Sequence, residues 1–284
     1  MEYQKSVIDL IKERRSCRSF IEKEIEPDKV QKLDTFITNI NSTIDIKTRF
    51  LLVKRGVKES NKAEKLGTYG FISGASSFIV GVIDRDEKKV EAFGHYFEKI
   101  ILYATDLGLG TCWLGGSFSR SDFEQKVNLS SNELIPIVSP VGYARSRRKI
   151  MDSVVRTIAN SNNRKPWNEI FFDTNSSSPL AQISAGEYKL PLEMVRIAPS
   201  ASNKQPWRII MDKDGFNFYL LRTKGYKLRS FDIQRSDLGI VMCHFELAAK
   251  ELKLNGAWQI NIKDKKSEEL EYITTWVPDE KIIP

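Results

Sequence analysis

Two long stretches of the chain carry apolar residues at helical spacing and resemble each other. Residues 94–113 (GHYFEKIILYATDLGLGTCW) and 239–258 (GIVMCHFELAAKELKLNGAW) each begin with a glycine and finish near a glycine or asparagine. This pattern is typical of a helix with a buried apolar stripe and a C-terminal stop residue. One constant offset of 145 residues aligns Gly94 with Gly239, Leu102 with Leu247, Ala104 with Ala249, Leu107 with Leu252, Leu109 with Leu254 and Trp113 with Trp258. We therefore predict the same long helix twice, with small residues where another helix can approach closely.

Short runs of branched apolar residues flank both helical stretches. RFLLVK (49–54) and RIIMDK (208–213) precede them, and ELIPIVSPVGYA (133–144) and ELEYITTWVPDE (269–280) follow them. Such runs predict buried strands. Because the order strand, helix, strand occurs twice, we predict an α+β fold made of two fused units, residues 1–175 and a shorter unit 176–284. The polar stretch DTNSSSPL (173–180) marks the seam.

Composition limits the class of protein. The chain has 284 residues, of which 41% are hydrophobic and 29% charged, which is enough apolar material for about two globular domains. No stretch approaches the roughly 20 apolar residues of a membrane helix. The first 16 residues are amphipathic and acidic in part, unlike a signal peptide. We expect a cytoplasmic protein without a membrane partner.

The residue types that most often carry chemistry are sparse. Cys17, Cys112 and Cys243 are too few and too scattered for a disulfide framework or a metal site, so we interpret them as small buried side chains. His95 and His244 lie in the two helical stretches, and we interpret them as core or surface residues. The sequence predicts no metal site and no catalytic triad.

Two polar segments stand out against this background. ERRSCRSF (13–20) concentrates basic residues, and IAPSASNKQPWRII (197–210) places turn formers and amides directly before an apolar strand. The strands 49–54 and 208–213 differ by an offset of 159, which sets residues 40–48 against the second segment and residues 173–177 against Arg14 to Arg18. Neither counterpart keeps the distinctive side chains. A two-fold dimer with sites at its interface, fused into one chain and left with one site, would show this pattern.

Charge permits an anionic partner without requiring one. The net charge is +7, with local excesses at Arg14, Arg15 and Arg18 and at residues 145–149. An RNA-binding or anion-binding protein is one alternative, and it would lose affinity steeply with salt. Because the basic clusters lack interleaved aromatic residues, we expect no nucleic-acid partner.

Four motifs together resemble one family. RRSCRSF (14–20), LGLGTCWLGG (107–116), NRKPWNEI (163–170) and APSASNKQPW (198–207) are similar, in the same order, to the flavin motifs and C-terminal arm of the nitroreductase family of FMN-dependent oxidoreductases, in its tandem form with two fused units. The resemblance implies two α+β units that pair through a long helix and hold FMN at their interface. Here the pair would lie within one chain, so we expect a monomer that acts as a pseudo-dimer.

The resemblance also implies roles for particular residues. Arg14, Ser16 and Arg164 would bind the FMN phosphate, Arg15 would contribute backbone or ribityl contacts, and Arg18 would reach the N1/O2 edge of the ring, where positive charge stabilises the reduced flavin. Pro199, Ser200, Ala201 and Asn203 would face the flavin from the second half, and Leu114, Gly115 and Gly116 would let backbone approach near N5. Two departures are the absence of a cation at Asn162 and of a second arm before Pro284.

The implied reaction needs no protein nucleophile. NAD(P)H would give hydride to flavin N5, and the reduced flavin would then reduce a small-molecule acceptor such as a nitroaromatic or a quinone. No G-x-G-x-x-G motif identifies the electron donor. A non-catalytic FMN-binding protein for storage or sensing, with its acceptor slot blocked by the second half, stays an open alternative.

Overall fold

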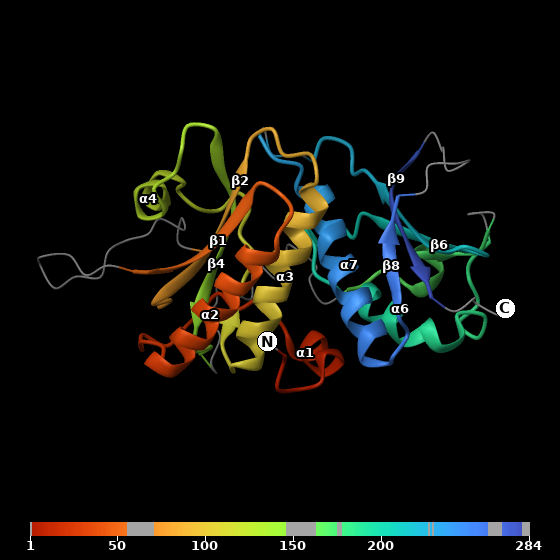
Figure 1. Ribbon diagram of the computed structural model, residues 1–284, viewed down its shortest axis with the longest axis horizontal. Helices are drawn as coiled ribbons and strands as arrows, with labels where there is room; N and C mark the ends of the chain where they lie inside the picture. The colour runs from red at the N-terminus through yellow and green to blue at the C-terminus, as the bar shows by residue number, and fades with distance from the viewer. Residues whose placement is uncertain are drawn as a thin grey trace, which may run out of the picture.

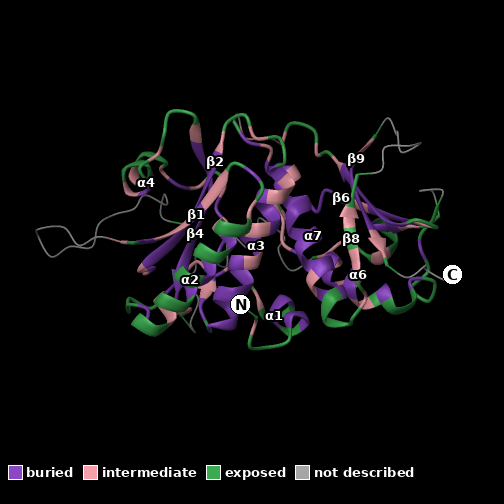
Figure 2. Ribbon diagram, viewed as in Figure 1, coloured by how far each residue is buried: buried purple, intermediate pink, exposed green. Residues whose placement is uncertain are grey.

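The computed structural model describes residues 2–55, 71–145, 163–174, 178–226, 228, 230–260 and 269–279. Two sheets lie on either side of a central pair of long helices, α3 (Val90–Asp106) and α7 (Ile233–Glu251) (Figure 1). Both helices are buried along most of their length, as Figure 2 shows. The predicted α+β class and the two predicted long helices are confirmed.

The first sheet has the strand order β1-β2-β4-β3. Its strands are β1 (Thr48–Lys54), β2 (Ser77–Asp84), β3 (Gly110–Thr111) and β4 (Glu133–Gly142), and all its pairs are antiparallel. Alternate residues of β2 enter different cores: Ile79 and Ile83 pack with α2 (Pro27–Thr43) and α3, whereas Val80 and Val82 pack with Phe123 of α4 (Ser121–Glu124). Burial on both faces explains why its strands are continuously apolar.

The second sheet has the order β5-β6-β7-β9-β8. Its strands are β5 (Phe171–Phe172), β6 (Trp207–Asp212), β7 (Gly215–Leu221), β8 (Gly256–Gln259) and β9 (Leu270–Pro278). β5 runs parallel to β6, and the other pairs are antiparallel. The segment that holds β5 lies before the predicted seam, yet its Ile170 and Phe171 are fully buried in the core of the second sheet with α6 (Lys189–Arg196) and α7.

The two sheets share one order of strands and helices. In each, two antiparallel strands are followed by the long helix and then by two more strands, which gives β1-β2-β4-β3 and β6-β7-β9-β8. All four predicted strands are present within a few residues of their expected bounds. Short 3-10 turns occupy Gln125–Val127, Trp167–Glu169, Gly186–Tyr188 and Ala201–Asn203.

The long helices cross at their matched glycines. A Cβ on Gly94 would lie 2.1 Å from the carbonyl oxygen of Ser236, and one on Gly239 would lie 2.0 Å from that of Glu91. The sequence pattern placed these glycines at the helix starts, but α3 begins at Val90 and α7 at Ile233, so both lie inside the helices. Their function is to let two backbones approach.

The helix ends differ in one respect from the expected stops. Gly108 follows α3 with a left-handed φ of 75°, as a C-terminal glycine should. After α7 the left-handed residue is Lys253, with a φ of 62°, and not the expected asparagine or glycine. The segment that follows is held by the apolar packing of Leu254 on the second core, which offsets the cost of this backbone conformation.

Helix α1 (Val7–Glu13) packs against both long helices and so places the arginine-rich segment between the two halves. Its Val7 and Leu10 share a core with Leu102 of α3 and Cys243 of α7. Ser6 caps its first turn by accepting a hydrogen bond from the amide of Asp9 at 3.2 Å. The three cysteines are buried and free, as expected. Among the described residues, no helix is both long and apolar enough to cross a membrane.

Candidate functional site

A cavity of about 460 Å³ lies between the two halves of the chain and gathers the residues that the sequence predicts for a cofactor site. α1 and its following segment form one wall, the loop after β3 a second, and the loop before β6 with one face of α7 a third. All twelve predicted residues line it: Arg14, Arg15, Ser16, Arg18, Leu114, Gly115, Gly116, Arg164, Pro199, Ser200, Ala201 and Asn203. Segments that lie far apart in the sequence thus meet at one cavity.

One end of this cavity is strongly basic. The Arg14 side chain is only 6% exposed, its nearest carboxylate is Glu98 at 3.8 Å, and its Nε and Nη1 atoms have no hydrogen-bond partner among the described residues. Burial lowers the pKa of Arg164 to about 10, and the charges of Arg14 and Arg196 add to this effect. Buried guanidinium donors crowded together in this way favour an anionic ligand.

The arm that carries Arg164 is tied to the loop of the second half. Arg164 donates from Nη1 to Asn203 Oδ1 at 2.8 Å and from Nε to the carbonyl of Ile197 at 3.0 Å. Asn203 Nδ2 donates in turn to the carbonyl of Asn163 at 2.7 Å. The side-chain amide of Asn203, which the sequence assigned to the flavin, therefore bonds the arm. Gln205 braces the loop as predicted, since its Oε1 accepts from the amide of Lys165 at 2.8 Å.

The loop before β6 holds an unusual backbone. Ser202, Asn203 and Gln205 have positive φ values of 47°, 54° and 50°. Ser200 Oγ accepts a hydrogen bond from the Gln205 amide at 2.8 Å, and the Asp237 carboxyl group accepts one from the Ala201 amide at 3.1 Å. Left-handed residues without glycine persist where the surroundings impose them, and they concentrate at functional sites.

The glycines after β3 have different reasons for being there. Leu114 exchanges backbone hydrogen bonds with Val138 at 2.9 and 3.0 Å, which fixes the loop. A Cβ on Gly115 would lie 2.6 Å from the Cδ1 atom of Ile233, so the approach of α7 already requires a glycine there. A Cβ on Gly116 would meet only Leu228 at 3.7 Å, so packing leaves room at this position. The expected approach of backbone to a ring is thus the better account of Gly116 than of Gly115.

Sequence reasoning missed the wall that α7 contributes. Ile233, Ser236, Asp237 and Ile240 line the cavity at helical spacing. Burial raises the pKa of Asp237 well above its usual range, although the Ala201 amide opposes the shift. The spacing was visible in the sequence, but only the crossing of the helices shows which face of α7 meets the cavity. The other lining residues that sequence reasoning missed are Phe71, Trp113, Ser117, Ile137, Ser202, Tyr226 and Leu228.

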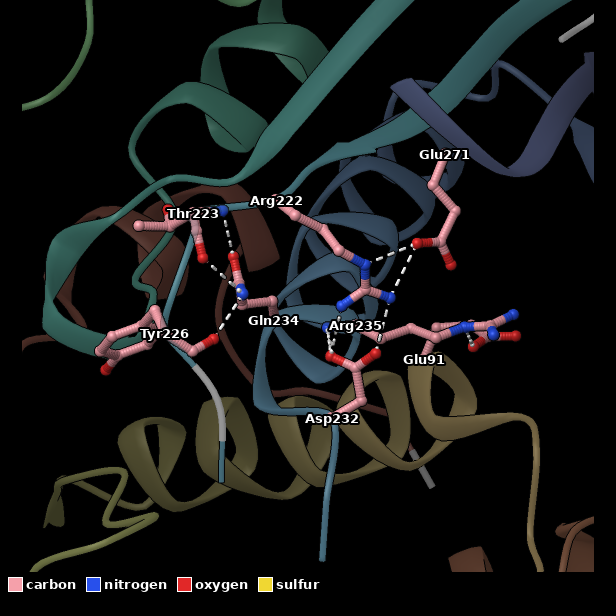
Figure 3. Close-up of polar contacts among 8 residues, drawn as sticks. All are labelled: Glu91, Arg222, Thr223, Tyr226, Asp232, Gln234, Arg235 and Glu271. Atoms are coloured by element: carbon pink, nitrogen blue, oxygen red, sulfur yellow. Dashed lines mark hydrogen bonds and ion pairs between the residues drawn. The ribbon is translucent and has the colours of Figure 1, made fainter. Parts of the chain in front are cut away.

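Tyr226 closes one side of the cavity from a well-anchored turn (Figure 3). Gln234 Nε2 donates to the Tyr226 carbonyl at 2.6 Å, and its Oε1 accepts from the Thr223 amide at 2.7 Å. Tyr226 Oη lies 2.9 Å from Ser202 Oγ, which links the turn to the loop before β6. Gln234 is buried, so its hydrogen bonds are shielded from water and hold the turn firmly.

Ion pairs secure the same turn to the rest of the fold (Figure 3). Arg222 lies 2.8 Å from Asp232, the N-cap residue of α7, and 2.7 Å from Glu271 of β9. Arg235 pairs across the helix crossing with Glu91 of α3 at 2.6 Å. The cavity wall at Tyr226 is therefore connected to both long helices and to the second sheet.

Comparison with known proteins identifies the family. Residues 6–249 match the family model described as "Putative TM nitroreductase". The chain belongs to this nitroreductase family. The resemblance seen in the four sequence motifs is thereby confirmed. No curated protein matches the chain.

Solved nitroreductase structures share the fold at low identity. One described as a putative nitroreductase, from Thermotoga maritima MSB8, is 18% identical, covers 98% of this chain and 95% of its own, and has a TM-score of 0.58. A nitroreductase family protein from Clostridium difficile 630 is 19% identical over 57% of this chain and 94% of its own, with a TM-score of 0.41. An FMN-dependent nitroreductase from Clostridium difficile R20291 is 20% identical over 50% and 90%, with a TM-score of 0.38.

Proposed function

We propose that the chain is an FMN-dependent oxidoreductase that passes hydride from NAD(P)H through its flavin to a nitroaromatic, a quinone or a similar small acceptor. Membership of the nitroreductase family supports the class of reaction. The observation that carries the proposal is the single cavity lined by all twelve residues that the flavin motifs predict.

The residues present fit FMN in charge and shape. The buried Arg14 donors without partners, with Ser16 and Arg164 beside them, suit a phosphate group that carries close to two negative charges. The opposite part of the cavity is apolar, with Trp113, Ile233 and other large side chains, and suits a planar ring. A volume of about 460 Å³ lies in the range of about 300–1,000 Å³ that is usual for cofactor sites.

Each wall has a distinct task in this proposal. Arg14 and Arg164 bind the phosphate, and Arg18 places positive charge near the pyrimidine edge of the ring. The flavin itself supplies the hydride-accepting atom when it is bound. The loop 199–203 and the turn at Tyr226 orient the ring and exclude water, because their own hydrogen bonds keep them in place.

We also propose that the chain is two fused family units that form a pseudo-dimer within a monomer, with units 1–175 and 176–284. Three observations support it: the common strand order of the two sheets, the crossing of the long helices at Gly94 and Gly239, and the addition of β5 to the second sheet. The last is the exchange of an arm that a two-fold dimer would make between subunits. One cavity then draws on both units.

Steady-state oxidation of NADH and NADPH, followed with menadione or nitrofurazone as acceptor, tests the enzymatic proposal. We expect turnover with at least one donor and one acceptor, with ping-pong kinetics because donor and acceptor would use the same slot. A yellow protein that retains FMN but oxidises neither donor would instead support the non-catalytic alternative. The cavity favours the enzyme, since it keeps an apolar wall beyond the basic end.

A further inference from the structure

A buried carboxylate of α3 links three elements behind the basic end of the cavity. Glu98 is fully buried, and its Oε2 accepts a hydrogen bond from Trp113 Nε1 at 2.8 Å. Its Oε1 lies 2.9 Å from Nε2 of His244, which is also fully buried on α7. The same Oε1 lies 3.8 Å from Nε of Arg14. Glu98 does not line the cavity, but Trp113 and Arg14 do.

The other end of the helix pair holds a reciprocal set. Glu246 of α7 lies 3.0 Å from His95 of α3 and accepts a hydrogen bond from Trp258 at 2.8 Å. Each long helix thus gives one glutamate and one histidine, and each glutamate also binds the matched tryptophan of its own half. The second set differs in its cation: Lys250 contacts Glu246 at 2.7 Å, and none of its members lines the cavity. It is a natural control for the first.

Hydrogen-bond directions fix the proton count of the first set. His244 Nδ1 lies 3.1 Å from the carbonyl oxygen of Met194, and a carbonyl only accepts, so Nδ1 carries a proton. His244 Nε2 and Glu98 Oε1 then need one further proton between them at 2.9 Å. Whether that proton is on the ring or on the carboxyl group, the pair has no net charge. Without it, the pair carries one negative charge.

That charge lies next to Arg14. With the proton in place, Arg14 presents a full positive charge, and without it, an unbalanced carboxylate at 3.8 Å offsets that charge. Tyr3 and Cys243 also face this region, and burial raises the pKa of both, so they stay neutral there. The remaining charged groups around it are Arg164 of the arm and Lys99, Asp106, Glu246 and Lys250 of the long helices.

We propose that Glu98 and His244 share one proton, and that this proton strengthens the binding of a phosphate group at Arg14. The inference rests on the proposed function, because the flavin phosphate is the anion in question. Glu98 acts through Arg14 and is a positioning residue. By linkage, binding of the phosphate also strengthens the hold of the pair on its proton.

Glu98→Gln separates charge from structure. A glutamine can still accept from Trp113 with its oxygen and donate to His244 Nε2 with its nitrogen, so every hydrogen bond of Glu98 has a replacement. It has no proton to lose, and so it mimics the protonated pair at every pH. Glu246→Gln makes the same change in the reciprocal set and is the matched control.

The experiment compares FMN with riboflavin by fluorescence titration of the full chain between about pH 7 and pH 9. Both ligands have the same ring, so their affinity ratio isolates the phosphate, which is fully ionised there because its second pKa is about 6. In the wild type and in Glu246→Gln we expect this ratio to fall several-fold as the pH rises, with a limit of about tenfold per pH unit for one proton. In Glu98→Gln we expect it to stay constant.

The same pH dependence in the wild type and in Glu98→Gln, including none in either, would overturn the inference and leave the proposed function intact. A wild type that does not prefer FMN to riboflavin at any pH would instead overturn the phosphate site and, with it, the proposed function. Calorimetry of the wild type in buffers of different ionisation enthalpy gives a second measurement that needs no variant. We expect FMN to take up part of a proton at about pH 8.5, and uptake equal to that with riboflavin would contradict the proposal.

Discussion

Gly94 of α3 and Gly239 of α7 lie against each other at the crossing of the two long helices, where a Cβ on Gly239 would stand 2.8 Å from the Gly94 Cα atom. The faces of α7 that meet the cavity and of α3 that hold Glu98 depend on this crossing, since it fixes how the helices are rotated against each other. The two glycines are therefore as important to the site as residues that line it.

Gly239→Ala tests this role of the crossing. The new methyl group would meet the Glu91 carbonyl at 2.0 Å and the His95 amide nitrogen at 2.6 Å, both backbone atoms that cannot move without shifting α3. We expect a loss of about 1–3 kcal/mol in the free energy of unfolding, measured with urea. Gly142→Ala is the control, because its Cβ would lie at an ordinary 3.4 Å from the Phe20 ring. An equal effect of both substitutions would contradict the account.

Arg14→Gln tests the phosphate site. The substitution removes the buried guanidinium donors that have no partner among the described residues, so we expect FMN affinity to fall about 10- to 100-fold, as for a charge-assisted hydrogen bond. Riboflavin affinity should change little. Arg85→Gln removes an exposed charge of the first sheet and controls for net charge. If riboflavin binding weakens as much as FMN binding, Arg14 does not bind the phosphate.

Arg18→Ala tests the tuning of the flavin. A cation near the pyrimidine edge stabilises the reduced ring, so its removal should weaken flavin retention and lower the reduction potential. The potential can be measured by equilibration with a reference dye. Arg15→Ala is the matched variant, because its proposed contacts are to the ribityl chain and its loss should leave the potential unchanged. A potential that is the same in Arg18→Ala as in the wild type would exclude this role.

Acid stability should report the pair between Arg49 and Glu133. Arg49 donates from Nε and Nη2 to the two carboxylate oxygens at 2.9 and 2.8 Å, and these bonds hold the pKa of Glu133 at about 2. Because the folded pKa is depressed, the contribution is complete above about pH 4.5 and is lost as the pH falls towards 2. The pair is partly exposed, so we expect Glu133→Gln to cost about 1 kcal/mol at pH 7 and little at pH 2, by urea unfolding. An equal cost at both pH values would contradict this.

Asp237 should have the opposite pH dependence. Burial raises its pKa in the folded chain, so its unfavourable contribution is absent below the unfolded pKa of about 3.8 and grows as the pH rises above it. Each unit of pKa difference costs about 1.4 kcal/mol. We expect Asp237→Asn to raise the free energy of unfolding at pH 7 relative to its effect at pH 4. A variant that stabilises equally at both would show that the carboxyl group does not titrate as its burial implies.

Much of this architecture could be predicted from local patterns. The strands and long helices follow from apolar periodicity, and all twelve predicted residues reach one cavity because motifs such as RRSCRSF and APSASNKQPW encode their own turns and caps. The family follows from the same motifs. These features depend on residues close together in the chain.

What could not be predicted depends on how the helices cross. His244 meets Glu98, and Asp237 meets Ala201, across 146 and 36 residues of sequence, and no local signal connects them. Asn203 was assigned to the flavin because amides suit its pyrimidine edge, but the arm passes close enough to take up that amide. Gly115 was explained by the ring, but α7 already demands it.

The most direct test of the account is to purify the protein, release its flavin by heat and quantify it against the chain. Because both halves contribute to a single cavity that holds all twelve predicted residues, we expect one FMN per chain, in a monomer. Two FMN per chain would show that the second half has a site of its own, and protein that neither contains nor binds FMN would contradict the proposed function.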